Sequence, residues 1–121
     1  MKPIKEYWGD RLPNNEGVTV TVWDGQRAEP LKHHVMHSPA GFEWGYEGSG
    51  PADLARCILI DYFSGQTDFV AVATKLADKY YQGFKRNVIA TIPGDRWLIS
   101  EVEIEKWVQH EMSKLEGGGN A

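Results

Sequence analysis

The chain has 121 residues, a formal net charge of −4 at pH 7 and a single cysteine. One cysteine excludes an intrachain disulfide and with it the class of small secreted disulfide-built domains, and no apolar run approaches the roughly 20 residues that span a bilayer. The negative charge disfavours a protein that binds nucleic acid by neutralising phosphates, although Lys79, Lys85 and Arg86 could form a local basic patch. The composition therefore predicts a soluble, cytoplasmic protein without a membrane segment.

The first part of the chain predicts a small antiparallel sheet. Residues 7–11 mix aromatic residues with turn formers and favour a short extended piece. Residues 18–23 (VTVTVW) alternate strictly and are rich in β-branched residues, which is typical of a strand. Residues 31–37 predict a return strand after the turn at Asp24 and Gly25, and residues 42–46 predict a third strand. We therefore expect a β-meander of about three strands.

The period of the apolar residues changes to that of a helix after residue 50. Residues 51–63 carry one apolar face and predict a helix that stops at Ser64 and Gly65. Residues 67–93 predict one helix or two, with Thr67 or Asp68 as the cap. Ser100 begins an S-x-x-E capping box that predicts a last helix. The apolar face of that helix is formed by Ile104, Trp107, Val108, Met112 and Leu115.

Strands followed by helices predict an α+β fold, with about three helices packed on one face of the sheet. We expect a single domain over residues 1–116. The glycine-rich residues 117–121 predict a flexible tail.

The best candidate for a functional site lies within residues 41–55 (GFEWGYEGSGPADLA). Residues 48–51 (GSGP) predict a turn before a helix, with Ser49 or Gly50 as its cap, and the first N–H groups of a helix can receive phosphate or carboxylate. The turn matches neither a P-loop nor a complete dinucleotide fingerprint. The candidate binding residues are Glu43, Trp44, Tyr46, Gly48, Ser49 and Gly50. The alternative is that the glycines only shape a turn before a capped helix.

Other residues give weaker indications of chemistry. Glu43 and Glu47 could perform acid–base work only if burial raised the pKa of one of them, and on a strand they would share one face. On a strand His33 and His37 would lie about 13 Å apart, too far to share a metal ion. We therefore expect no catalytic residue, no metal and no cofactor, and we expect Cys57 to be a small core residue.

The chain is rich in large aromatic residues, and the predicted helix faces do not account for all of them. The ones left over are Trp8, Trp23, Trp44, Tyr46 and Trp97. Those that are exposed would serve as anchors in an interface with a partner, where aromatic residues are enriched. The alternative is that they fill the core between the sheet and the helices.

The run over residues 41–55 resembles the signature of a small domain family of unknown function that is met in bacteria, plasmids and bacteriophages. Four further stretches fit the resemblance: YxGxR at residues 7–11, HSP at 37–39, YQxFK at 81–85 and IPxDxW at 92–97. The resemblance covers about residues 7–107. It implies no activity and no catalytic residue. The setting on mobile elements implies an accessory role, such as interference with a host defence like CRISPR.

These observations lead to three hypotheses. The first is a non-enzymatic protein that binds a macromolecular partner, namely a protein of the host or the phage, in the manner of an anti-CRISPR protein. The alternative is a domain that binds a small molecule or nucleotide at the turn over residues 48–51. The third is a self-associating subunit, that is, a homo-oligomer.

Overall fold

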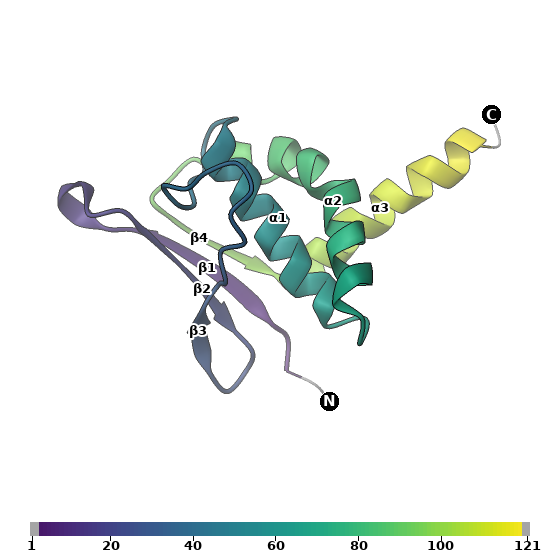
Figure 1. The fold of residues 1–121 in the computed structure, drawn as a ribbon, viewed down its shortest axis with the longest axis horizontal. Coiled ribbons are helices and arrows are strands. Elements are labelled where there is room, and N and C mark those ends of the chain that lie inside the picture. Colours follow the sequence, from purple (N-terminus) through teal and green to yellow (C-terminus); the bar gives the residue numbers. More distant parts are fainter. Residues whose placement is uncertain (1–2, 120–121) are drawn as a thin grey trace.

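Four strands form one antiparallel sheet within residues 3–119, the part that the computed structural model describes, with side chains for residues 3–115 (Figure 1). The strands are β1 (Glu6–Arg11), β2 (Val18–Trp23), β3 (Ala28–Pro30) and β4 (Arg96–Ser100). Their order in the sheet is β3-β2-β1-β4, so that β1 pairs with both β2 and β4. A short 3₁₀ helix, η1 (Pro13–Asn15), connects β1 to β2.

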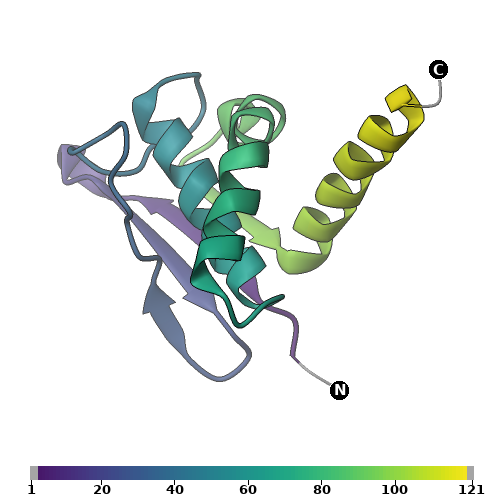
Figure 2. The same cartoon turned by 45° about the vertical axis from the view of Figure 1, so that its right-hand side comes forward.

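The helices lie on one side of this sheet. They are α1 (Ser49–Ser64), α2 (Val70–Asn87) with the short η2 (Ile89–Thr91) after it, and α3 (Glu101–Gly119). α1 covers the sheet and packs along α2, while α3 starts at the end of β4 and points away from the other elements (Figure 2). The predicted α+β class with its helices on one sheet face is confirmed, although the sheet has four strands instead of about three.

Two of the predicted strands are wrong. The return strand is β3 at Ala28–Pro30, not residues 31–37. Leu31 N still donates to Val20 O, but the chain then leaves the sheet because later backbone N–H groups of this segment bond to α1. Residues 42–46 are also not a strand. Gly41 (φ +119°) and Gly45 (φ +89°) are in the left-handed region and turn the chain at both ends of this piece.

Two strands, the central β1 and the late β4, were less evident from the sequence. The predicted extended piece at residues 7–11 is β1, which lies inside the sheet with a neighbour on each side. β4 was not predicted as a strand, because five residues that begin with Arg96 show no clear alternation. Gly9 of β1 is the partner of Trp97 in β4, so this pairing joins segments far apart in the sequence.

The helix predictions hold with shifts at the ends. The helix predicted over residues 51–63 is α1, and its predicted end at Ser64 is confirmed. The stretch from residue 67 forms one α-helix, α2, whose N-cap is Phe69 instead of Thr67 or Asp68. Ser100 Oγ accepts a hydrogen bond from Glu103 N (3.3 Å) at the start of α3. α3 continues to Gly119, within the predicted tail, and residues 120 and 121 lie outside the described residues.

The core lies between the inner sheet face, α1 and α2. The predicted apolar face of α1 is completely buried: Leu54, Ala55, Ile58, Leu59, Tyr62 and Phe63. Cys57 is buried as predicted, and burial raises the pKa of its thiol to about 11. None of the helices in the described part is long and apolar enough to cross a membrane.

Candidate functional site

Asp53 ties the irregular segment between β3 and α1 to the first turns of α1. Its side chain is fully buried, and its carboxylate accepts four hydrogen bonds. The donors are His33 Nε2 (2.8 Å) and the backbone N–H groups of Met36 (3.2 Å), His37 (2.9 Å) and Ser38 (3.1 Å). Burial alone would raise the pKa of the Asp53 carboxyl, but these hydrogen bonds outweigh it and lower that pKa below its ordinary value. Asp53 is therefore an ionised anchor for residues 33–38.

The hydrogen bond to Asp53 fixes the tautomer of His33. A carboxylate can only accept, so Nε2 of His33 carries the proton, and in the neutral imidazole Nδ1 is then an acceptor. The imidazole packs on the Phe42 ring, with the ring centroids 4.4 Å apart. None of the side chains described for residues 3–115 forms a hydrogen bond with Nδ1. One acceptor of a well-oriented imidazole is thus left open.

Glu43 and Trp44 belong to a second anchor, which is built around Arg11. Arg11 Nη1 donates to both carboxylate oxygens of Glu43 (2.7 Å each), and Arg11 Nε donates to Asp95 Oδ1 (3.1 Å). The guanidinium lies 4.7 Å from the centroid of the Trp44 ring, and Trp44 Nε1 donates to Gly94 O (2.8 Å). Trp44 is buried, and the carboxylate of the partly exposed Glu43 is occupied by Arg11, so both candidate residues are engaged by contacts within the domain.

Two glycines of the predicted turn lie close to other side chains. A Cβ on Gly50 would lie 2.8 Å from Glu43 Cβ, and a Cβ on Gly48 would lie 2.6 Å from Cε2 of Tyr46. Gly48 is the N-cap of α1, where the sequence predicts Ser49 or Gly50. Ser49 begins the helix and is exposed. Close packing thus explains Gly50, whereas at Gly48 the half-exposed Tyr46 ring could move aside, and Ser49 and Tyr46 remain accessible.

The accessible candidate residues border a hollow of about 630 Å³ at the start of α1. Four of the six candidates line it: Glu43, Tyr46, Ser49 and Gly50. His33, Phe42 and Glu16 contribute the other large side chains of the wall. Its volume is in the range of small-molecule sites, about 300–1,000 Å³. Trp44 and Gly48 are not part of this wall.

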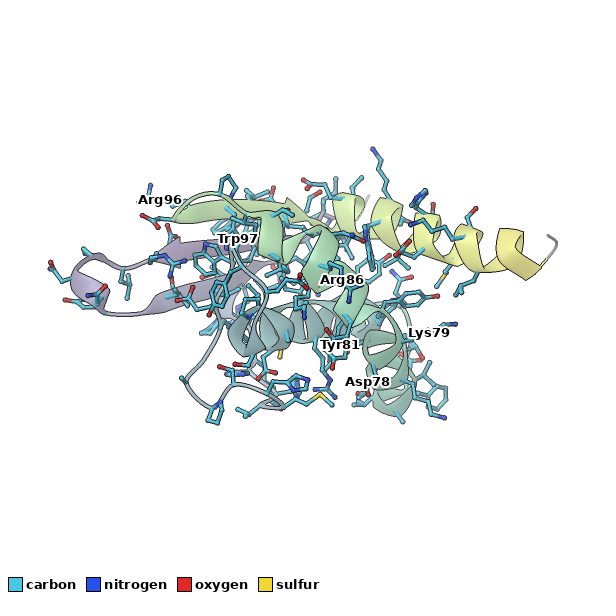
Figure 3. All side chains as sticks on the ribbon, turned by 90° about the horizontal axis from the view of Figure 1, so that it is seen from above. Asp78, Lys79, Tyr81, Arg86, Arg96 and Trp97 are labelled. Atoms are coloured by element: carbon cyan, nitrogen blue, oxygen red, sulfur yellow. The ribbon has the colours of Figure 1, made fainter. Side chains whose placement is uncertain are left out.

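Tyr46 borders the hollow, and the other four leftover aromatic residues divide between the two faces of the sheet. Trp44 and Trp97 contact each other edge to face on the helical side, with centroids 5.6 Å apart, and Trp97 lies between β4 and the helices (Figure 3). Trp8 and Trp23 stack on the opposite, outer face, with centroids 5.8 Å apart. Half-exposed Leu98 is the partner of Trp8 on β4.

The outer face is not covered by any helix of residues 3–119 (Figure 3). β1 and β4 contribute an ion pair to it, Asp10 Oδ1 with Arg96 Nε (2.8 Å). The face therefore combines a tryptophan pair, an exposed leucine and a neutralised pair of charges.

The basic patch considered from the sequence is partly neutralised. Lys85 Nζ and Arg86 Nε each lie 3.7 Å from Glu47 Oε1, and Lys79 Nζ lies 5.4 Å from the centroid of the Tyr80 ring. Lys85 and Arg86 thus share one carboxylate, and the contact with the Tyr80 ring does not cancel the charge of Lys79, so the patch keeps part of its positive charge.

Sequence reasoning missed three residues that organise the site: Arg11, His33 and Asp53. His33 was considered only as a metal ligand on a strand, and that strand does not exist. Asp53 gave a usable signal, because it is an acidic residue among the buried positions at the start of an apolar helix. A buried acid in such a place needs donors, which only the loop before the helix could supply.

The fold and the site define a small α+β protein with a preformed hollow and an uncovered aromatic sheet face. The chain belongs to a family of unknown function (DUF6166), whose model matches residues 7–110. Searches of the curated proteins and of the solved structures gave no match.

Proposed function

We propose that this protein is a non-enzymatic binding protein that engages another protein through the outer face of its sheet. The observation that carries the proposal is the stacked Trp8–Trp23 pair beside the exposed Leu98. Tryptophans are among the residues most enriched at the energetic centres of interfaces, and both rings are still partly exposed, so a partner can remove further apolar area from water there. The neutral Asp10–Arg96 pair at the rim would supply polar contacts without a net charge.

The setting that we propose is the cytoplasm of a host bacterium, with a component of a defence system such as CRISPR as the target. This part of the proposal rests on the mobile-element setting that the family resemblance implies. The outer face fits a protein target better than a nucleic acid, because Asp10 and Arg96 cancel each other and Glu6, which accepts a hydrogen bond from Trp8 Nε1, adds a negative charge beside the tryptophan pair.

Replacing both outer tryptophans by threonine is expected to abolish capture of the partner. Threonine keeps the preference for strand, so the sheet should persist. Each tryptophan lost from an interface centre is expected to weaken binding by about 30-fold, which corresponds to about 2 kcal/mol. The measurement is affinity capture of the tagged protein from host lysate, read by mass spectrometry, followed by the affinity of the purified partner for Trp8→Thr and Trp23→Thr chains.

The matched control is Phe69→Ser, which removes an aromatic side chain that is 70% exposed at the start of α2, away from the sheet. It should leave the affinity unchanged. A partner that binds the double threonine variant as tightly as the unaltered chain would refute the outer face as the interface. Light scattering on the pure protein distinguishes a foreign partner from a second copy of this chain. Recovery of a partner without a role in defence would refute the proposed setting, but the outer sheet face would still stand as the proposed interface.

The hollow at the start of α1 favours a second candidate function, the binding of a small molecule. Ser49→Phe is expected to fill the hollow from its exposed rim, whereas any side chain at Gly50 would collide with Glu43. A ligand that raises the Tm of the unaltered chain should then fail to raise that of the variant. The measurement is a thermal-shift screen with nucleosides, nucleotides, cyclic nucleotides and phosphate, and a screen without a single shift would eliminate this function.

A further inference from the structure

His33 is oriented in the way that a ligand-binding imidazole requires. Its Nε2 is held by the buried Asp53 carboxylate at 2.8 Å, and its ring is held by Phe42. Since both the ring and the proton are fixed, Nδ1 has a defined position before any ligand arrives. His33 lines the hollow, and its side chain is 21% exposed to solvent.

The free polar side-chain groups of the hollow are mainly acceptors. In the neutral imidazole His33 Nδ1 can only accept, as can the Glu16 carboxylate, while the hydroxyls of Ser49 and Tyr46 can both accept and donate. None of these groups is bonded to another side chain in residues 3–115. A complementary ligand therefore carries several N–H and O–H donors.

The charged side chains of the hollow argue against a phosphate. Its described lining includes no lysine or arginine. Glu43 is already paired with Arg11, so the Glu16 carboxylate remains as a negative charge at the rim. This carboxylate would repel a doubly charged phosphate and oppose the attraction of the α1 N-terminus, where Ser49 and Gly50 border the hollow, whereas an uncharged molecule meets no such repulsion. The rings of Phe42 and Tyr46 offer flat apolar faces for a planar group.

We propose that the hollow binds an uncharged ring compound rich in N–H and O–H donors, the class that nucleosides represent, and that His33 Nδ1 is the acceptor that recognises it. This inference rests on the second candidate function, small-molecule binding at this hollow, and names its ligand class and its recognition residue. It is independent of the outer sheet face.

The test is titration calorimetry with adenosine, guanosine and cytidine on the full chain. At least one nucleoside should bind, and the corresponding 5′-monophosphate should bind more weakly. His33→Phe should weaken binding about tenfold through loss of one buried hydrogen bond. His33→Gln should bind within about threefold of the unaltered chain, because its amide can donate to Asp53 while its oxygen replaces Nδ1 as acceptor.

Nitrogen NMR of the unaltered protein provides a test that does not depend on folding of the variants. The Nδ1 resonance of His33 should shift on nucleoside addition, while His110, on α3 outside the hollow, should not respond. One outcome is that Ser49→Phe abolishes nucleoside binding, His33→Phe leaves the affinity unchanged and the Nδ1 resonance does not shift. In that case the small-molecule function stands and this inference is refuted. Tighter binding of the monophosphate would refute the uncharged class. No nucleoside binding at all, or binding unaffected by Ser49→Phe, would refute the inference.

Discussion

Asp53→Asn is expected to lower the free energy of unfolding by about 3 kcal/mol, the scale for breaking a buried, hydrogen-bonded charge. The carboxylate accepts hydrogen bonds at both oxygens, three at Oδ2 and one at Oδ1. An asparagine has one acceptor oxygen, and its amide nitrogen would face an N–H donor of the loop. Loss of the anchor would free residues 33–38 from α1. Urea unfolding followed by circular dichroism measures the change.

Asp68→Asn is the matched control, because Asp68 is exposed and makes no hydrogen bond or ion pair through its side chain within residues 3–115. Its effect on the free energy of unfolding should be within about 0.5 kcal/mol.

The difference in the free energy of unfolding between the unaltered chain and Asp53→Asn should depend on pH. Because the pKa of Asp53 is lowered in the folded state, its contribution is complete above the unfolded pKa of about 3.9 and is lost as pH falls through the folded pKa. The gap between the unaltered chain and Asp53→Asn should therefore narrow below about pH 4. A gap that is constant in acid, or a loss under about 1 kcal/mol at neutral pH, would refute the anchor.

Gly9→Ala is expected to cost about 2–3 kcal/mol, because it overfills the inner face of the sheet. A Cβ at this position would overlap the indole ring of Trp97, its partner on β4. Trp97 cannot move freely, since it packs edge to face on Trp44, which in turn supports the Arg11 guanidinium. The measurement is again chemical denaturation.

A double-mutant cycle isolates the collision. On a Trp97→Ala background the added methyl group of Gly9→Ala should cost no more than about 0.5 kcal/mol, because the ring that it meets is gone. Gly94→Ala is the control for the intrinsic effect of the substitution, since a Cβ there meets no atom within 4 Å. An equal cost of Gly9→Ala on both backgrounds would show that backbone conformation, and not Trp97, requires the glycine.

The parts of the fold that could be predicted are those whose signal is local. The alternation of residues 18–23 and the helical period of residues 51–63 each report on a few neighbouring residues, and β2 and α1 follow them closely. β4 could not be predicted in this way, because what makes it a strand is its pairing with β1 at the other end of the chain. The predicted strands at residues 31–37 and 42–46 failed for a related reason. Hydrogen bonds to Asp53 and two left-handed glycines decide that region, and neither produces a periodic pattern.

The location of the candidate site could be predicted from the sequence, but the set of residues that form it could not. The glycine-rich turn over residues 48–51 directed attention to the start of α1, where the hollow lies. What the sequence could not reveal is which residues of the turn are occupied by internal contacts. Glu43 and Trp44 stand in the same run as Tyr46 and Ser49, yet Arg11 engages the first two and leaves the others accessible. The sequence does not show this division, because Arg11 lies on β1, 32 residues before Glu43 in the chain.

The position of β1 between β2 and β4 has a consequence for synthesis of the chain. β1 is the first strand to leave the ribosome, but one of its two edges can be paired only after residue 100 has been made. During the interval the strand presents unpaired N–H and C=O groups, and its two faces carry Tyr7 and Trp8. The long sequence separation also makes this pairing slow to form, because a large loop must close first. We therefore expect β4 to pair with β1 late in folding. The nascent chain should be most prone to aggregation just before this pairing forms.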